Sequence, residues 1–268
     1  MERISKSQLK LVRSLQLKKF RDETGWFVAE GEKCVEELRR GFELVYYIRT
    51  TVDDRVQTNL LLATSTEIEQ MSGLRTPQGI IGVFKKRPAP QISSSFKAGL
   101  ILALDGIQDP GNLGTIIRTC DWFGVHDIIC SHDTADCYNP KVVQATMGAL
   151  ARVKVHYVED LSLTLSSIEG AKIYGTLLDG KNMYEELSNL EELPNSQTGR
   201  SAKLSHNAII VMGNEGKGIS SEIRKIITYP LYIPSYTDNG QIKETSDVVE
   251  SLNVSIATSI VLAEFRRR

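Results

Sequence analysis

Residues 100–124 read LILALDGIQDPGNLGTIIRTCDWFG, and this stretch decides the fold class. Its first six residues form a nearly continuous apolar run, which is typical of a strand buried on both faces of a parallel sheet. A glycine-rich loop follows, and residues 113–123 have a helical composition, with Asn112 as the expected N-cap. A buried strand followed by a helix is the repeating unit of α/β folds, so the stretch predicts a parallel sheet.

The same alternation continues to the C-terminus. Comparable apolar runs predict strands at 126–130, 172–178, 207–212 and 230–233. Helical patterns alternate with them at 141–150, 219–227 and 251–267. This order indicates a parallel sheet that is covered by helices on both faces. Residues 185–205 are polar and irregular, and we expect a surface loop there.

The first 85 residues form a second, smaller α/β pattern. They predict helices at 5–19 (with Ser5 as N-cap), 32–40 and 67–71, and strands at 26–29, 42–49 and 79–84. Residues 85–98 read KKRPAPQISSSFKA, a composition that is typical of a linker. We therefore predict an N-terminal domain over about 1–90, a linker over about 85–98 and a larger domain over 99–268.

Composition limits the class of protein. The chain has 268 residues, 41% of them hydrophobic, and a net charge of −1, which is ordinary for a globular protein. No apolar run has the length of a membrane span, and the N-terminus is too polar for a signal peptide, so we expect a cytoplasmic protein. The cysteines form no C-x-x-C pair and are expected as free thiols, with no metal site: Cys34, Cys120, Cys130 and Cys137.

Because the net charge is close to zero, any affinity for nucleic acid must come from local basic clusters. The chain has three: residues 85–87, residues 266–268, and a longer one near the N-terminus. The N-terminal cluster contains Arg3, Lys6, Lys10, Arg13, Lys18, Lys19 and Arg21. For each cluster, an ordinary solvated surface is the alternative.

Ligand sites in open α/β sheets lie beyond the carboxyl ends of the strands. The loop GNEGKGIS at 213–220 follows a strand there, but it lacks the spacing of both the P-loop and the dinucleotide fingerprint. Glu215 within it suits a cationic ligand better than a phosphate. The alternative is a plain strand-to-helix turn.

Two other segments have candidate polar groups. Arg118 lies six residues after Asn112, and helical side chains tilt toward the N-terminus, so Arg118 can reach back toward the loop. An ion pair with Asp121 is the alternative that spacing alone favours slightly. Near the C-terminus we expect Ser251 as a helix N-cap with Asn253 in the first turn, and ordinary capping is the alternative there.

Taken together, these segments resemble the SpoU/TrmH family of RNA methyltransferases in the SPOUT superfamily. The matching motifs are N-L-G-T-I-I-R at 112–118, G-N-E-G at 213–216, and I-P at 233–234 followed by S-L-N-V-S-I-A at 251–257. The segment NPKVVQATMGAL at 139–150 is also similar to the family. FVAEGEKCVEEL at 27–38 resembles the family's accessory substrate-binding domain, with less specificity.

The resemblance implies a C-terminal domain with a deep trefoil knot, and a homodimer. It implies transfer of a methyl group from S-adenosylmethionine to a ribose 2′-hydroxyl of structured RNA, ribosomal or transfer. The implied cofactor-binding residues are Gly213, Asn214, Gly216, Ile233, Pro234 and Leu252. Here residues 235–250 form a longer link between two of these segments than the family usually has, and either a lid or a harmless insertion would explain it.

The resemblance also implies the catalytic set, which consists of Arg118, Asn112, Glu215, Ser251 and Asn253. Arginine stays protonated in nearly every protein setting. We therefore prefer Arg118 as a clamp on the adjacent phosphate over Arg118 as the base. Two alternative functions are that of a catalytically inactive, RNA-binding member of the family and that of a dinucleotide-dependent oxidoreductase. The intact polar residues disfavour the first, and the missing glycine fingerprint disfavours the second.

Overall fold

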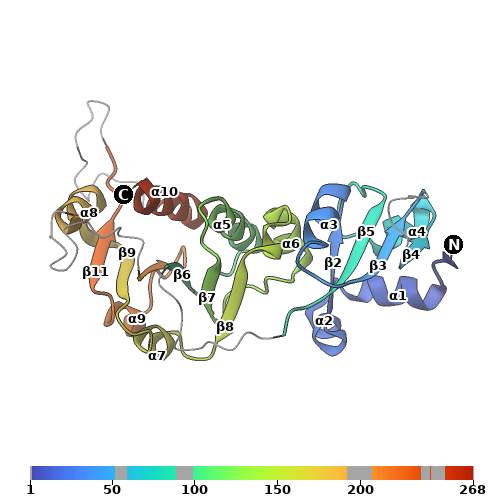
Figure 1. Cartoon of the computed structure of the whole chain (residues 1–268), viewed down its shortest axis with the longest axis horizontal. Helices are drawn as coiled ribbons and strands as arrows, with labels where there is room; N and C mark the ends of the chain where they lie inside the picture. Colours follow the sequence, from blue (N-terminus) through green and yellow to red (C-terminus); the bar gives the residue numbers. More distant parts are fainter. Residues whose placement is uncertain are drawn as a thin grey trace. The chain divides into compact units, whose positions relative to one another are not determined.

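The computed structural model describes residues 2–51, 59–88, 99–191, 207–236, 242 and 251–267 (Figure 1). The chain divides into two compact units. Unit 1 comprises Met1–Pro90, Asp109–Arg118 and Ala135–Lys154, and unit 2 comprises Gln91–Gln108, Thr119–Thr134 and Val155–Arg268. Each unit is built around its own sheet, so the predicted mixed α/β class is confirmed.

Unit 2 is organised by a six-stranded sheet in the order β11-β9-β10-β6-β7-β8. Its strands are β6 (Leu100–Asp105), β7 (Asp127–Ser131), β8 (Lys154–Val158), β9 (Lys172–Asn182), β10 (Ala208–Gly213) and β11 (Tyr229–Tyr232). β6 pairs in parallel with β7 and β10, β10 with β9, and β9 with β11. The predicted parallel sheet is confirmed, and its strands end at one common edge.

Helices cover both faces of this sheet (Figure 1). α7 (Leu161–Ser166) and α9 (Ser221–Arg224) cover one face, where Ile101, Ile129 and Ile209 belong to the same buried cluster as side chains of both helices. α10 (Val254–Arg267) lies over the other face, and α5 (Pro110–Trp122) begins in unit 1 and ends in unit 2. Side chains alternate between the faces along a strand, which is why near-continuous apolar runs are needed.

Unit 1 contains a five-stranded sheet in the order β1-β4-β3-β5-β2. Its strands are β1 (Glu2–Arg3), β2 (Trp26–Glu30), β3 (Leu44–Arg49), β4 (Leu60–Leu62) and β5 (Ile80–Lys85). Its helices are α1 (Lys6–Ser14), α2 (Lys18–Thr24), α3 (Glu32–Leu38), α4 (Ser65–Met71) and α6 (Pro140–Thr146), with the 3-10 turn Ala149–Ala151. Most predicted elements are present with shifted ends, whereas β1, β4, β8 and α7 were not predicted.

Two segment predictions were wrong. The helix expected over 5–19 ends at Ser14, and the backbone of Leu17 is extended before the separate helix α2 begins. The surface loop expected over 185–205 begins instead as helix α8 (Met183–Glu191), and the rest of that prediction lies outside the described residues. The same holds for most of the 235–250 link, of which only residues 235, 236 and 242 are described, with an antiparallel bridge between Tyr236 and Ile242.

Both N-caps predicted for the site helices were also wrong. The amide of Asn112 donates to Oδ1 of Asp109 at 2.8 Å, so Asp109 caps α5. Pro110 at the first helical position explains the earlier start, since proline lacks the amide hydrogen that would be unpaired there. Asn253 caps α10, because its Oδ1 accepts from the amide of Ser255 at 3.0 Å. By contrast, Ser5 caps α1 as predicted.

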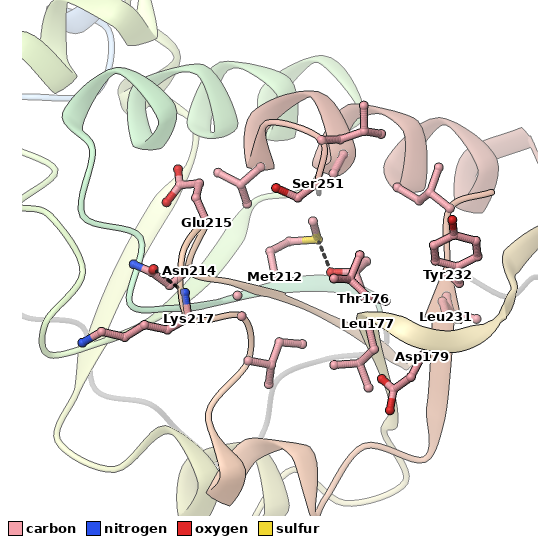
Figure 2. A pocket seen from close by; sticks show the side chains of 18 of the residues that line it. Thr176, Leu177, Asp179, Met212, Asn214, Glu215, Lys217, Leu231, Tyr232 and Ser251 are labelled. Atoms are coloured by element: carbon pink, nitrogen blue, oxygen red, sulfur yellow. Dashed lines mark hydrogen bonds between the residues drawn. The ribbon is translucent and has the colours of Figure 1, made fainter. Parts of the chain in front are cut away.

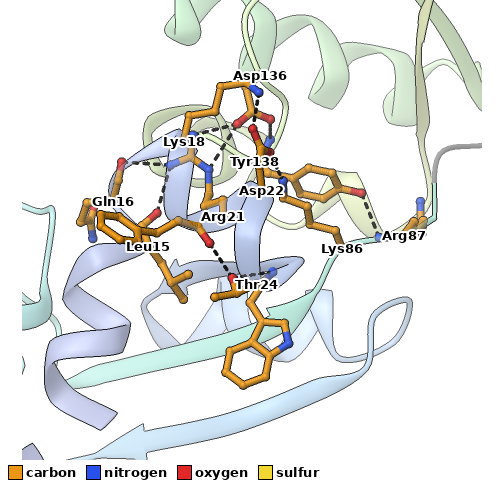
Figure 3. A network of polar contacts seen from close by, with 12 residues as sticks. Leu15, Gln16, Lys18, Arg21, Asp22, Thr24, Lys86, Arg87, Asp136 and Tyr138 are labelled. Atoms are coloured by element: carbon orange, nitrogen blue, oxygen red, sulfur yellow. Dashed lines mark hydrogen bonds and ion pairs between the residues drawn. The ribbon is translucent and has the colours of Figure 1, made fainter. Parts of the chain in front are cut away.

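A buried arginine holds together distant segments of unit 1 (Figure 3). Arg21 is 1% exposed, and its Nη2 donates to Oδ2 of Asp136 at 2.7 Å. Its Nη1 donates to the carbonyls of Leu15 and Gln16 at 3.0 and 2.9 Å. The break between α1 and α2 therefore supplies two acceptors for a guanidinium that would otherwise be buried without partners.

Apolar contacts surround this ion pair. The ring of Tyr138 packs 4.8 Å from Phe27, and the Tyr138 hydroxyl accepts from the amide of Arg87 at 3.2 Å. Burial of Cys34, opposed by a hydrogen bond from the Gly148 backbone, raises the pKa of its thiol to about 12. Residues on both sides of the predicted linker thus share one core within unit 1.

The remaining expectations concern membranes, metals and thiols. All four cysteines are buried, and none of them forms a disulfide. Among the residues that the structure describes, no group of three or more His, Cys, Asp or Glu side chains could hold a metal ion. None of the helices in those residues has the length and apolar character of a membrane span.

Replacing Asp136 should destabilise unit 1 strongly. Asp136→Asn leaves the Arg21 guanidinium buried without its counter-charge, which typically costs about 3–5 kcal/mol. Lys18→Gln is the control, since its ion pair with Asp22 is exposed and such pairs contribute about 0–1 kcal/mol. Urea unfolding followed by circular dichroism measures both variants. Equal midpoints for the two would contradict the structural role of Arg21.

Candidate functional site

Unit 2 contains a cavity of about 530 Å³ at the carboxyl edge of its sheet (Figure 2). Such a volume is typical of sites for small molecules and cofactors. Its walls come from the ends of β9, β10 and β11, the loop after β10, and the start of α10. The lining residues are Thr176–Asp179, Met212–Ile219, Arg224, Leu231–Ile233, Ser251, Leu252, Val254 and Ala257.

A bulge in β9 forms one wall of the cavity. Gly175 pairs with Pro230, but the next pair along is Lys181 with Leu231, so residues 176–180 leave the ladder. The Thr176 hydroxyl, within this bulge, donates to the Val211 carbonyl at 3.4 Å. The sequence gives no local sign of this bulge, because the pattern of residues 172–178 predicts an uninterrupted strand. The position of residues 176–180 at the end of a parallel strand was the signal that could have found them.

The loop after β10 is fixed by Asn214. The amide of Asn214 donates to the Gly218 carbonyl at 3.1 Å, and Gly218 donates back at 2.8 Å. The Asn214 side chain donates to the Gly106 carbonyl at 2.7 Å and accepts from the amide of Gly216 at 2.9 Å. Asn214 therefore ties the loop to the end of β6 and closes the turn through which the chain returns.

Two further residues hold this loop in place. Oδ2 of Asp105, at the end of β6, accepts from the amide of Ser220 at 2.7 Å. A Cβ atom on Gly213 would lie 2.5 Å from the carbonyl carbon of Gly218, so only glycine allows the two backbone segments to approach this closely. The sequence does not indicate that Asp105 and Ser220 hold this loop in place, because a hydrogen bond between residues 115 positions apart leaves no local pattern.

The cavity combines an apolar floor with charged groups at its rim. Figure 2 shows Asn214, Glu215 and Lys217 on one side and Tyr232 and Asp179 on the other. Asp179 forms an ion pair with Arg224, another lining residue. Met212, Leu177, Leu231 and Val254 supply apolar surface. The site can therefore take a ligand that has both an apolar part and charged groups.

Most residues predicted for the site are brought together here. The cavity is lined by Gly213, Asn214, Glu215, Gly216, Ile233, Ser251 and Leu252. Pro234 is buried but does not line it, and Asn253 is used as the cap of α10. The other two predicted residues, Asn112 and Arg118, belong to unit 1.

Arg118 lies on the exposed face of α5. It makes no hydrogen bond or ion pair with any residue that the structure describes. The ion pair with Asp121, which spacing alone favoured, is therefore not formed. Because an arginine without local partners contributes little to stability, Arg118 is available to bind an external group.

Two family profiles match different parts of the chain. The profile of the SpoU rRNA Methylase family matches residues 99–263, which include all the strands of unit 2 and every lining residue of the cavity. The chain belongs to this family. A second profile, the MRM3-like substrate binding domain, matches residues 6–82.

Similar proteins cover nearly the whole chain. A 23S rRNA (guanosine(2553)-2'-O)-methyltransferase, RlmP of Bacillus subtilis, is 29% identical over 95% of this chain and 94% of its own length. The structure of a TrmH-family protein from Porphyromonas gingivalis has a TM-score of 0.82 at 36% identity and covers 98% of each chain. An AdoMet-bound rRNA methyltransferase from Sinorhizobium meliloti has a TM-score of 0.79 at 28% identity, covering 100% of this chain and 97% of that one.

These findings confirm the family that the motifs indicated. They also confirm the predicted enzyme class, an S-adenosylmethionine-dependent RNA 2′-O-methyltransferase.

Substitution of Gly213 should impair cofactor binding. In Gly213→Ala the new methyl group would meet backbone atoms of Gly218 and Ile219, which cannot move as a side chain can. The loop must shift, and we expect at least a tenfold loss of S-adenosylmethionine affinity, about 1.4 kcal/mol. Titration calorimetry measures the affinity, and thermal unfolding verifies that the variant is folded. Unchanged affinity in a folded variant would contradict the assigned role of this loop.

Proposed function

We propose that the chain methylates a ribose 2′-hydroxyl of ribosomal RNA, with S-adenosylmethionine bound in the unit 2 cavity. The cavity itself is the observation that carries the proposal, since seven of the residues implied by the family motifs line it. Ribosomal RNA is preferred to transfer RNA because the family profile and the B. subtilis relative both name rRNA.

The residues of the cavity fit this cofactor. Backbone groups around Gly213, Gly216, Ile233 and Leu252 would hold it, and the apolar floor would take its uncharged parts. The carboxylate of Glu215 suits a ligand that carries positive charge, whereas Asp179 is neutralised by Arg224. Pro234, which is buried next to the lining residue Ile233, would support the backbone at this point of the cavity wall. Asn214 would hold the loop at 213–218 in its conformation through its side-chain hydrogen bonds. When bound, S-adenosylmethionine supplies the methyl group that is transferred.

Arg118 would hold the RNA. Its guanidinium has the geometry to bind a phosphate through two hydrogen bonds, and its positive charge would stabilise the alkoxide that develops on the ribose. This role is supported by its exposure and by the absence of partners among the described residues. Asn112, in the first turn of the same helix, would orient it. Glu215, Ser251 and Asn253 would complete the polar surroundings of the reacting hydroxyl.

The backbone near the cavity is expected to form the deep trefoil knot of the family. The two family profiles support different tasks for the two parts of the chain. Residues 1–90 would bind the RNA substrate and 99–268 would bind the cofactor and carry out the transfer, which is supported by the MRM3-like match. The cytoplasmic location stays a prediction.

The enzyme is proposed to act as a homodimer through α5 and α10. Trp122 is 85% exposed and Ile256 is 53% exposed, which is unusual for large apolar side chains. Within unit 2 the two helices are joined directly, since Nε of Arg266 on α10 donates to the Phe123 carbonyl just after α5 at 2.6 Å. A second copy covering this surface would remove both side chains from water.

The proposed activity is tested by incubating the protein with radiolabelled S-adenosylmethionine and transcribed 23S rRNA, followed by mapping of the 2′-O-methyl position. Methylation of a base, or transfer to transfer RNA alone, would overturn the proposal.

Arg118→Ala should abolish most methylation without affecting folding. Loss of one group that stabilises charge in the transition state typically lowers kcat about 100- to 1000-fold. S-adenosylmethionine affinity and the unfolding midpoint should stay unchanged, because Arg118 has no partner among the described residues. Thr115→Ala, one turn earlier on the exposed face of α5, is the matched control. Near-normal turnover of Arg118→Ala would exclude a catalytic role.

Trp122→Asp should convert the dimer to monomers. A buried charge at an apolar interface without a partner costs several kcal/mol, enough to shift association by orders of magnitude. Sedimentation equilibrium measures the mass of the wild type and the variant. A monomeric wild type, or a variant that dimerises with the same affinity, would contradict the proposed interface.

A further inference from the structure

The structure separates the cations of the two basic clusters in the first 90 residues into those that serve the packing of unit 1 and those that are exposed. Arg21 is buried in the ion pair with Asp136 and is not accessible (Figure 3). Arg87 donates to the carbonyls of Val153 and Ala151, so it is also part of the packing of unit 1. What distinguishes the rest is whether an acidic side chain neutralises each one.

Helix α2 neutralises its own charges. Lys18 lies 2.6 Å from Asp22 and Lys19 lies 3.9 Å from Glu23, both at the i,i+4 spacing. Asp22 also accepts from Lys86 at 2.6 Å, and hydrogen bonds from the two lysines hold its pKa below the ordinary value. This part of the surface therefore offers little free positive charge to a partner.

Helix α1, by contrast, carries positive charges that no acidic residue of the helix neutralises. Its sequence, KSQLKLVRS, contains no acidic residue, and Lys6, Lys10 and Arg13 follow one another at the spacing of a single helical face. All three are exposed, whereas Val12 on the opposite face is buried. Within the described part of the chain none of the three has a hydrogen bond or ion pair.

This arrangement has a cost for the helix. Lys6 occupies the first position of α1, where the helix dipole disfavours a cation. Lys6 and Lys10 repel each other at the i,i+4 spacing, and Lys10 and Arg13 repel each other at the i,i+3 spacing. Residues that weaken the element containing them and pack against nothing point to a binding role.

We infer that Lys6, Lys10 and Arg13 form the surface on which unit 1 binds the RNA phosphate backbone. The inference rests on the proposed function and narrows it to one helix face. Three cations spaced along about 10 Å of helix form a linear row, which suits the regularly spaced charges of a nucleic-acid strand. The nearby acidic groups are on other elements: Glu2 on β1, and Glu67 and Glu69 on α4.

Glu67 does not neutralise the row. Hydrogen bonds from the backbone and hydroxyl of Thr64 lower its pKa, with a smaller contribution from the charge of Arg3. Its carboxylate is thus engaged in capping α4. Three other described cations of the first 90 residues also have no hydrogen bond or ion pair within the described part of the chain. They lie on separate segments: Arg3 on β1, Lys33 on α3 and Arg75 in the loop after α4.

The test compares two full-length triple variants with the same net charge. The first carries Lys6→Gln, Lys10→Gln and Arg13→Gln, and the second carries Lys18→Gln, Lys19→Gln and Lys85→Gln. Each lysine replaced in the second lies within 4 Å of an acidic side chain. Affinity for transcribed 23S rRNA is measured from 0.05 to 0.3 M salt, together with the unfolding midpoint and S-adenosylmethionine affinity.

For the α1 variant we expect binding that is roughly 100-fold weaker at 0.1 M salt, and a salt slope shallower by about 2 to 3. Its unfolding midpoint should equal or exceed that of the wild type, which a structural role would not allow. The second variant should keep its RNA affinity within about threefold. Equal RNA affinity and slope in wild type and α1 variant would overturn the inference, even if the wild type methylates the RNA. A wild type that neither binds nor methylates the RNA would overturn the proposed function as well.

Discussion

The parallel pairing of β6, β9, β10 and β11 is the constraint on which the site depends. Parallel strands place all their carboxyl ends at one edge, so segments that are far apart in sequence meet there without any local signal. The bulge at 176–180, the loop after Gly213 and the start of α10 each supply one wall of the cavity. A change in the order or direction of one strand would separate them.

Hydrogen bonds between these segments fix the shape of the cavity wall. The Asn214 side chain and the Asp105 carboxylate join the loop after β10 to the end of β6, while Gly213 allows the close backbone approach. These bonds use side chains that look like candidate ligand contacts in the sequence. Fewer polar side chains are therefore available to contact a ligand than the motifs contain. This explains why the proposed cofactor site relies mainly on backbone groups.

The cations of unit 1 also differ in what they do: some stabilise the fold and others are exposed to a partner. The most basic part of the sequence contains a buried arginine that serves the fold, lysines that are neutralised within α2, and a row on α1 without acidic partners. Sequence composition gives the same weight to every one of these cations. Burial and pairing separate them, because a neutralised or buried charge contributes little to long-range attraction of a polyanion.

The sequence by itself determined the α/β class, the parallel sheet, the family and seven of the residues that line the cavity. Apolar runs report strand burial directly, and short motifs survive as contiguous letters, so both can be read locally. Only the tertiary structure decided which residues cap α5 and α10, that Arg118 lacks the Asp121 ion pair, and that the β9 bulge lines the cavity. It also decided that Arg21 is buried, since Asp136 lies 115 residues away and the acceptors at Leu15 and Gln16 exist only because α1 ends early. Contacts of this kind depend on which segments the fold brings together, and no periodicity in the sequence encodes that.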